Sequence, residues 1–344
     1  MANERYSRQV ILEGVGEQGQ ARLAAARVVI VGCGGLGSPV AAYLAGAGVG
    51  HLRLIDGDRP EVSNLHRQVF YSVEQSGSKT EQLAAHLQRL NPKVRVQSFG
   101  KRLDEGNVHK LLAESDLILD CTDDAVTKHL ISDACVVLQT PLVYAAAQGF
   151  TGYLALFENR PGGIHLRDVY PEPDPSLPDC ATAGVLPTAV GIVALLQANA
   201  ALCYLLGIGD PPINRLLTYS ALDNSQHRVR LQKTYHEPIS LATPNASAVR
   251  DSLEVVADSL PPGGFTTVFS MLSEAREPAL PPGVVRLDGK NPVGDCIERM
   301  EDGGRYLVYC NSGKLSLVLA AQVRKARPEV EVYSLKGGVK GVEN

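Results

Sequence analysis

Residues 27–58 read RVVIVGCGGLGSPVAAYLAGAGVGHLRLIDGD, and this stretch decides the fold. Its first part, Arg27–Val31, is a β-branched run typical of a buried strand. The next part, Gly32–Gly37, fits the pattern G-x-G-x-x-G and opens a predicted helix over Ser38–Gly48. A second predicted strand, Leu52–Ile55, follows. A strand, a glycine loop, a helix and a strand in this order predict a nucleotide-binding βαβ unit.

The glycine loop and the acid after the second strand explain why a nucleotide would bind. Glycines let the backbone approach a phosphate, and the helix N-terminus presents N–H groups with a partial positive charge. We expect Gly34, Gly35 and Leu36 to lie against the nucleotide and Asp56 to hold a ribose hydroxyl. The motif does not say which nucleotide binds. NAD is the first expectation, and a glycine-rich turn without a ligand is the alternative.

Strand and helix patterns alternate through the first half of the chain. This alternation predicts an α/β fold with a Rossmann-like, doubly wound, largely parallel sheet. Thr188–Leu206 has almost no polar face and is expected to be buried, either in the core or in a subunit interface. Further strands are expected at Val94–Ser98, Leu117–Leu119, Leu142–Ala147 and Gly152–Phe157, and helices at Val108–Ala113 and Ala125–Leu138.

The composition is that of an ordinary globular protein, with 44% hydrophobic and 20% charged residues. The 344 residues are enough for about two domains. A net charge of −4 provides no electrostatic case for binding nucleic acid or an anionic membrane. Two long uncharged stretches, Val28–Gly50 and Cys180–Gly209, are expected to be buried elements rather than membrane spans, because glycine, proline and amide residues interrupt them.

The N-terminus and the cysteines favour a cytoplasmic protein. The first residues, MANERYSRQ, are polar and charged and do not resemble a signal peptide. The seven cysteines are odd in number, widely spaced and without a C-x-x-C pair. This argues against a disulfide framework and fits a reducing compartment.

Three cations and one further carboxylate accompany the glycine loop. Arg8, Arg67 and Lys79 lie in polar segments that flank the first βαβ unit, and Asp123 follows a central strand. Ligands of an open parallel sheet bind beyond the carboxyl ends of its strands, where Asp56 and Asp123 are expected. Hydride transfer to NAD does not need this set. Chemistry at a phosphate does, because cations stabilise developing charge and a carboxylate can hold Mg²⁺.

Six motifs in one order carry a family resemblance. They are RYSRQ, GCGGLGS, LIDGD, SNLHRQ, SK and DCTDD, and the segment CATAGVL that begins at Cys180 continues the match. Over residues 5–231 the chain resembles the adenylating enzymes related to ubiquitin-activating enzyme, of the molybdopterin-synthase and thiamine sulfur-carrier adenylyltransferase type. The resemblance implies ATP-dependent adenylation of the C-terminal glycine of a small ubiquitin-like sulfur-carrier protein ending in Gly-Gly. This adenylation releases pyrophosphate and is a step towards the thiocarboxylate of the carrier.

The resemblance also implies roles for individual residues. Asn64, Arg67 and Lys79 are expected to contact phosphates, and Asp123 is expected to bind Mg²⁺. Arg8 matches an arginine that the family supplies from the partner subunit, which implies a homodimer. The expected nucleotide site consists of Gly34, Gly35, Leu36, Asp56, Asp58, Asn64, Arg67, Gln68, Lys79 and Asp123, and the expected catalytic set is Arg8, Arg67, Lys79, Asp123, Cys180 and Cys310.

Two other functions stay open at this point. One is an NAD-dependent oxidoreductase, in which the cations and Asp123 would have no role. The other is a catalytically silent, partner-binding relative. That alternative is motivated by Asp124, which stands where the family usually has asparagine, and by the loss of the family's zinc cysteines.

The family usually carries a zinc ion held by two C-x-x-C pairs, and both pairs are missing here. The corresponding places read GIHLRDV at residues 163–169 and KTYHE at residues 233–237. We therefore predict no zinc. His165, Asp168, His236 and Glu237 are the alternative, as ligands of a substitute site.

The C-terminal part resembles a rhodanese, or sulfurtransferase, domain. Its loop C-x-x-G-x-x-S begins at Cys310, between a strand and a helix, and this geometry lowers the pKa of a cysteine so that it can carry a persulfide. The arginine usual in this loop is Leu315 here, so a degenerate docking domain is the alternative. Cys180 stands where some relatives carry a cysteine that bonds covalently to the carrier. The expected domains are 1–238 for the ATP-binding adenylyltransferase, 239–264 for a linker and 265–344 for a shortened rhodanese-like domain.

Overall fold

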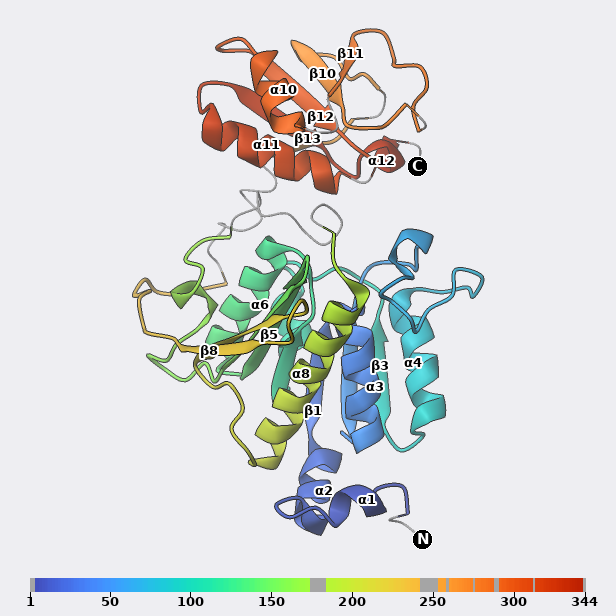
Figure 1. The fold of residues 1–344 in the computed structure, drawn as a ribbon, viewed down its shortest axis with the longest axis vertical. Coiled ribbons are helices and arrows are strands. Elements are labelled where there is room, and N and C mark those ends of the chain that lie inside the picture. The colour runs from blue at the N-terminus through green and yellow to red at the C-terminus, as the bar shows by residue number, and fades with distance from the viewer. Residues whose placement is uncertain are drawn as a thin grey trace. The chain divides into compact units, whose positions relative to one another are not determined.

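The computed structural model describes residues 4–173, 184–241, 253–257, 260–274, 276–287, 291–311 and 313–342. These residues fall into two compact units (Figure 1). The first unit holds residues 4–172 and 184–241, and the second holds Pro173 and the described residues from 253 onward. Cys180 lies outside the described residues, so its role stays a prediction.

The first unit is built on an eight-stranded sheet with the order β3-β2-β1-β4-β5-β6-β7-β8. The strands from β3 to β5 run parallel, and β6, β7 and β8 extend the sheet by antiparallel pairing. The predicted largely parallel, Rossmann-like sheet is confirmed. The strands are β1 Arg27–Val31, β2 His51–Ile55, β3 Arg95–Phe99, β4 Leu117–Asp120, β5 Leu142–Gln148, β6 Thr151–Phe157, β7 Arg215–Ser220 and β8 Gln226–Arg230. The helices are α1 Ser7–Val10, α2 Gly16–Ala25, α3 Gly37–Ala47, α4 Lys79–Leu90, α5 Val108–Leu112, α6 Ala125–Leu138 and α8 Pro187–Leu206, with short 3-10 turns at Val62–Asn64 and Leu166–Asp168.

Strand β1 separates two hydrophobic cores. Val28 and Ile30 pack into one core with residues of α2, α3, α4 and α8, whereas Val29 and Val31 pack into a second core with residues of α5 and α6. Successive side chains of a strand point to opposite faces of the sheet. The uninterrupted apolar run of β1 is therefore explained by helices on both faces (Figure 1).

Helix α8 is the apolar helix predicted around Thr188–Leu206. It begins with Pro187 at its first position and ends at Gly207, which has a left-handed conformation. Among the described residues, α8 is the helix whose length and composition would allow a membrane crossing, but half of its apolar stretch is buried inside the first unit. Its buried Gln197 donates hydrogen bonds to the backbone oxygens of Asp120 and Val143. This face of the helix therefore belongs to the core.

The second unit has its own five-stranded sheet, ordered β11-β10-β12-β13-β9, in which every strand pair is parallel. Strand β9 lies inside the stretch 239–264 that the sequence assigned to the linker. It pairs Glu254 with Ser334 and Val255 with Leu335, so these two residues are part of the second sheet. The strands are β9 Glu254–Val255, β10 Thr267–Ser270, β11 Val284–Arg286, β12 Arg305–Tyr309 and β13 Glu331–Leu335, and the helices are α10 Pro292–Glu298, α11 Lys314–Ala326 and α12 Val339–Val342.

Candidate functional site

The glycine loop lies where the strand order of the first sheet reverses, between the carboxyl ends of β1 and β4. Open α/β sheets bind ligands at such a switch point. Gly32 has a φ of +86°, and a Cβ there would lie 2.6 Å from the backbone oxygen of Cys121. A Cβ at Gly37 would lie 1.9 Å from the oxygen of Gly32. Both positions require glycine because the loop is pressed against the end of β4 and closes tightly on itself.

The loop presents a row of unpaired backbone donors. In the part of the chain that the structure describes, no acceptor pairs with the N–H groups of Gly34, Gly35, Leu36 and Gly37. The Ser38 hydroxyl donates to the Gly34 oxygen over 2.7 Å and helps to fix the conformation of the loop. Unpaired N–H groups at the start of a helix form a cradle for an anion, and a phosphate fits it.

Asp56 is already turned toward this loop. Its Oδ2 accepts a hydrogen bond from the backbone N–H of Cys33 at 2.7 Å, and its Oδ1 accepts one from the N–H of Asp58 at 2.8 Å. Burial raises the pKa of the Asp56 carboxyl, and the nearby ammonium of Lys79 opposes this effect. The acid lies beside the first residues of the loop, in the position from which a ribose hydroxyl can be held.

Lys79 is a buried cation at the first position of α4, with 4% of its surface exposed. Its Nζ lies 3.2 Å from Oδ2 of Asp58, and its backbone N–H donates to the Asp58 oxygen. Arg102 contacts the other carboxylate oxygen of Asp58, also at 3.2 Å. A cation at a helix N-terminus is electrostatically unfavourable, and Asp58 offsets that cost. Asp58 thus holds Lys79 in the site.

Arg67 and Gln68 come from the loop after β2 and lie against the glycines. A Cβ at Gly35 would meet the backbone oxygen of Arg67 at 3.2 Å, and a Cβ at Gly34 would meet Nε2 of Gln68 at the same distance. The guanidinium of Arg67 donates to Oδ1 of Asn64 over 2.9 Å. Gln68 is 5% exposed, and its Oε1 is buried without a hydrogen-bond partner among the described residues. Arg67 and Gln68 thus lie against the glycine loop, and Asn64 contacts Arg67.

Asp123 and Asp124 have different surroundings in the turn after β4. Asp124 is the N-cap of α6 and accepts a hydrogen bond from the Thr127 N–H over 2.9 Å. This explains why an acid is acceptable at a position where the family has asparagine, since both residues cap helices well. Asp123 is exposed, one residue after Thr122, whose backbone nitrogen would lie 3.0 Å from a Cβ at Gly32. Asp123 therefore belongs to the turn that packs against the first glycine of the loop.

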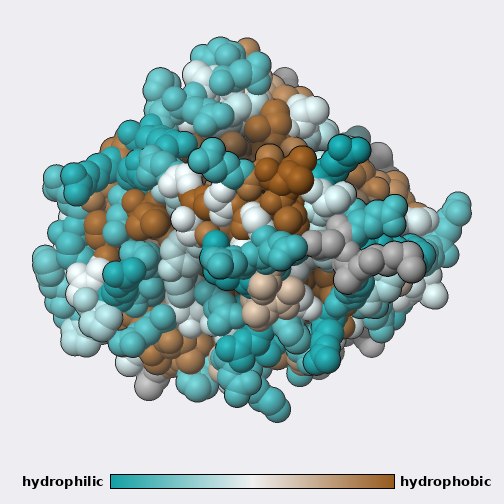
Figure 2. Space-filling model, turned by 90° about the horizontal axis from the view of Figure 1, so that it is seen from below, coloured by the Kyte–Doolittle hydropathy of each residue, from teal (hydrophilic) through white to brown (hydrophobic). Residues whose placement is uncertain are grey.

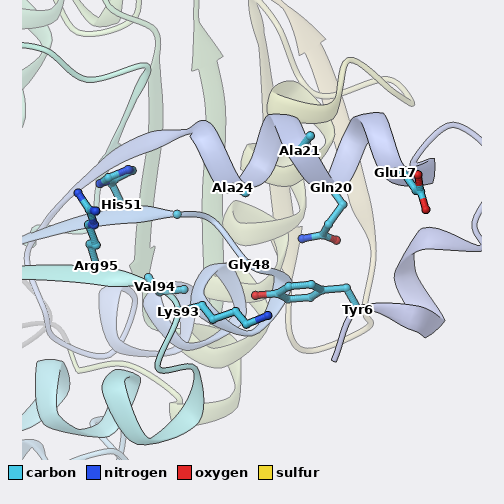
Figure 3. Close-up of a pocket in the computed structure, with 11 residues that line it drawn as sticks. Tyr6, Glu17, Gln20, Ala21, Ala24, Gly48, His51, Lys93, Val94 and Arg95 are labelled. Carbon is cyan, nitrogen blue, oxygen red and sulfur yellow. The ribbon is translucent and has the colours of Figure 1, made fainter. Parts of the chain in front are cut away.

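Arg8 is not brought to this site within one copy of the chain. The segment that carries it packs at the other end of α3: a Cβ at Gly48, the C-cap, would lie 2.7 Å from the ring of Tyr6. Tyr6 also lines a cleft of about 540 Å³ at the amino ends of β2 and β3, with His51, Lys93 and Arg95 (Figure 3). This cleft lies at the amino ends of the strands, whereas the glycine loop lies at their carboxyl ends. We therefore do not assign it to the nucleotide site.

The two places where the family carries its zinc cysteines do meet in the structure. Asp168, whose side chain is fully buried, lies 3.3 Å from Nζ of Lys233, and that ammonium also lies 2.8 Å from Nε2 of His165. His236 and Glu237 are exposed. Among the described residues, no group of three or more His, Cys, Asp or Glu side chains is arranged to hold a metal ion. These contacts join the segment around Asp168 to the segment around Lys233.

Cys310 lies at the end of β12 in the second unit and is 2% exposed. The Ser316 hydroxyl lies 3.4 Å from its Sγ and 2.8 Å from the hydroxyl of Ser334. A Cβ at Gly338 would lie 2.2 Å from the Cys310 oxygen, so the second unit closes tightly over this loop. The sequence indicated Cys310 and Ser316, but it did not indicate Ser334, which lies on β13 and contacts Ser316.

Comparison with known proteins agrees with the resemblance seen in the motifs. Residues 6–239 match the ThiF family. The chain is 42% identical to the sulfur carrier protein adenylyltransferase of Thermus thermophilus over 243 residues, which is 69% of this chain and 90% of that protein. It is 33% identical over 365 residues to the probable adenylyltransferase/sulfurtransferase MoeZ of Mycobacterium tuberculosis, which covers 97% of this chain and 91% of MoeZ.

The fold of the first unit also occurs in a solved structure. The crystal structure of E. coli MccB with ATP superposes with a TM-score of 0.57 and 22% identity, and covers 69% of this chain and 74% of MccB. At this identity the likeness shows the fold alone. With the family match across most of the chain and the full-length match to MoeZ, the chain belongs to the ThiF family.

Proposed function

We propose that this chain uses ATP to adenylate the C-terminal glycine of a small ubiquitin-like sulfur-carrier protein. The observation that carries the proposal is the cradle of unpaired N–H groups at Gly34–Gly37, with Arg67 and the buried Lys79 beside it and Asp56 at its start. The relatives named as sulfur-carrier adenylyltransferase and adenylyltransferase/sulfurtransferase support the same substrate and both activities.

The reaction requires an activated carboxylate, because a free carboxylate is a poor electrophile. A carboxylate oxygen of the carrier attacks the α-phosphorus of ATP, the bond from that phosphorus to the bridging oxygen breaks, and pyrophosphate leaves. Asp56 orients the ribose, and the N–H cradle orients the phosphates. Arg67 and Lys79 stabilise the charge that develops on the phosphate oxygens, a role worth about 10²–10³ in rate for one such group.

We propose that Mg²⁺ binds together with ATP. Proteins usually hold Mg²⁺ through one or two carboxylates together with substrate phosphates. The exposed Asp123 beside the glycine loop fits this donor set. Bound there, Mg²⁺ would neutralise part of the negative charge on the leaving pyrophosphate.

A homodimer is proposed because Arg8 lies far from its own glycine loop. Helix α3 has 11 residues and is about 16 Å long, with the loop at one end and the Arg8 segment at the other. A two-fold axis that pairs α3 antiparallel with its copy would bring Arg8 of one copy beside the loop of the other.

Exposed apolar side chains support a covered face. They are Tyr43 on α3, Leu195 on α8, and Ile11 and Leu12 after α1, which are 57%, 41%, 76% and 56% exposed. On the face that carries α1 and α2, apolar side chains form patches among polar ones (Figure 2).

A mixing experiment tests the shared site. Subunits with Arg8→Ala and subunits with Lys79→Met should each be inactive as homodimers. A heterodimer of the two has one site with both residues intact, so random exchange at equal amounts should restore about a quarter of the wild-type rate. No recovery, with exchange verified by native mass spectrometry, would refute the proposal.

Cys310 is proposed to deliver the sulfur. A persulfide on Cys310 attacks the carbonyl carbon of the carrier adenylate through its terminal sulfur, and AMP leaves. The carrier is then joined to Cys310 through an acyl disulfide, which a thiol reductant cleaves to the thiocarboxylate. Mass spectrometry after incubation with thiosulfate tests the first step. Absence of an added sulfur atom on Cys310 would favour a degenerate docking domain.

The deciding test of the adenylation proposal is exchange of labelled pyrophosphate into ATP, measured with and without candidate carrier proteins that end in Gly-Gly. Carrier-dependent exchange is expected, and no exchange with any carrier would refute the proposal. The proposed location is the cytoplasm, supported by the odd number of widely spaced cysteines. Cell fractionation tests this location.

A further inference from the structure

A buried ion pair lies directly behind the turn that carries Asp123. Asp120, the last residue of β4, is fully buried, and its Oδ2 lies 3.0 Å from Nζ of Lys128 on α6. Lys128 is 8% exposed. Its ammonium also donates to the backbone oxygen of Ala145 over 2.8 Å and lies 4.8 Å from the ring centroid of Tyr144, both on β5. The motifs in the sequence do not include this pair.

A signal for Lys128 is nonetheless present in the sequence. Lys128, Ile131 and Cys135 are three and seven residues apart, so they share one face of α6, and all three are buried. A single cation on an otherwise apolar helical face needs a buried partner, since an unpaired charge in a core is very costly. Asp120 is that partner.

The other oxygen of Asp120 determines the shape of the turn. Its Oδ1 accepts a hydrogen bond from the backbone N–H of Thr122 at 3.0 Å and one from the Thr122 hydroxyl at 2.7 Å. Gln197 holds the backbone oxygen of Asp120 from the other side. At the far end of the turn, Asp124 caps α6. Both ends of the turn are therefore fixed by directed hydrogen bonds, with Asp123 between them.

Stability alone does not explain an ion pair at this place. Replacing a buried pair by well-packed apolar residues is often neutral or stabilising. An apolar pair, however, could not fix the backbone N–H and the hydroxyl of Thr122. What the pair adds is the conformation of residues 120–124, and this conformation sets where Asp123 lies relative to the glycine loop.

We propose that Lys128 is a positioning residue for the adenylation site: it orients Asp120, and Asp120 holds the turn that presents Asp123 to Mg²⁺ and ATP. The proposal rests on the proposed function, because it takes ATP with Mg²⁺ as the ligand of the loop. Residues that orient metal ligands from behind typically contribute about 10–100-fold to metal affinity.

The test measures ATP binding by calorimetry, once with Mg²⁺ and once with EDTA, on the full chain. Lys128→Met should raise the Kd for ATP with Mg²⁺ about tenfold and leave the Kd in EDTA unchanged. Lys128→Arg, which keeps the charge, should recover most of the loss. Thr122→Val keeps the ion pair and removes only the hydroxyl contact, so it should show a smaller shift of the same kind.

Asp133→Asn is the matched control, because it breaks another largely buried ion pair on the same helix, in which Asp133 meets Arg167 at 2.9 Å. It should lower stability without changing the effect of Mg²⁺ on ATP affinity. An equal shift in this control, or an unchanged Kd in a folded Lys128→Met, would overturn the proposal. If Lys128→Met does not fold, an unchanged Kd in Thr122→Val overturns it. A wild-type chain that binds no ATP would refute the proposed function itself.

Discussion

Replacing Asp168 tests what joins the two segments that carry zinc cysteines in the family. The Oδ1 of Asp168 accepts hydrogen bonds from the backbone N–H groups of Thr234 and Tyr235, both at 2.7 Å. Its Oδ2 accepts from the N–H of His165 at 2.9 Å and from Nζ of Lys233 at 3.3 Å. In Asp168→Asn, the single amide oxygen can serve only one of these two sides. The amide NH₂ then faces two donors on the other side.

The expected cost of Asp168→Asn is about 3 kcal/mol. Breaking a buried ion pair costs about 3–5 kcal/mol, and the lower end applies because the Lys233 side chain is 28% exposed and can regain water. In Lys233→Met the carboxylate keeps its three backbone donors, so the expected cost is about 1 kcal/mol. For a unit of this size, Tm should therefore fall by about 6–12 °C in Asp168→Asn and about 2–4 °C in Lys233→Met.

Differential scanning calorimetry of the full chain at neutral pH measures these shifts in the transition of the first unit, with and without EDTA. Asp210→Asn is the control, because it breaks an exposed pair with Arg215 in the same unit and should leave Tm unchanged. Two results would refute the reasoning. One is an Asp168→Asn variant that melts with the wild type. The other is a wild-type Tm that EDTA lowers as far as this substitution does, because a metal would then join the segments.

The stabilisation by Asp168 also depends on pH. Burial pushes the pKa of Asp168 upward, but hydrogen bonds from the N–H groups of Tyr235, His165 and Thr234 outweigh it and leave the pKa below its ordinary value. A carboxyl with a depressed folded pKa stabilises the fold above the unfolded pKa of about 3.9, and this is lost as pH falls through the folded value. The Tm difference between wild type and Asp168→Asn should therefore stay constant at about pH 5–8 and close in stronger acid.

Three further predictions concern the loop, its cation and acid stability. Gly35→Ala should lower kcat/KM for pyrophosphate exchange about 10–100-fold, because a Cβ would lie 2.8 Å from Cγ1 of Val190 and displace the loop. An unchanged kcat/KM would show that this loop does not bind the phosphates. Lys79→Met should slow exchange about 10²–10³-fold, whereas Arg102→Met, which removes an exposed cation from the same cluster, should change the rate less than about tenfold; equal effects would contradict the role of Lys79. Burial and the neighbouring ammonium of Lys233 lower the pKa of His165 in the folded chain. The first unit should therefore lose stability as the pH falls below about 6.5, because the imidazole then takes up a proton in the unfolded chain but not in the folded one. His165→Gln should flatten this loss in calorimetry, and an unchanged profile would rule out His165 as its source.

Much of the first unit could be predicted because its signals are local. The β-branched run of β1 lies at Arg27–Val31 as predicted, and α3 begins within one residue of the expected Ser38. Periodicity and glycine spacing act over a few residues, so they determine elements and the phosphate loop. The two-residue strand β9 has no such signal. Only its pairing with β13 identifies it as a strand.

The sequence alone therefore determined the βαβ unit, the nucleotide loop and the set of charged residues that accompany it. Only the tertiary structure decided how these charges are partnered: Lys79 with Asp58, Asp120 with Lys128, and Asp168 with Lys233. It also decided that Asp124 caps α6, whereas Asp123 is exposed in the turn before it. The physical reason is that these contacts depend on which strands and helices lie side by side. This order in space is not encoded in the spacing of residues along the chain.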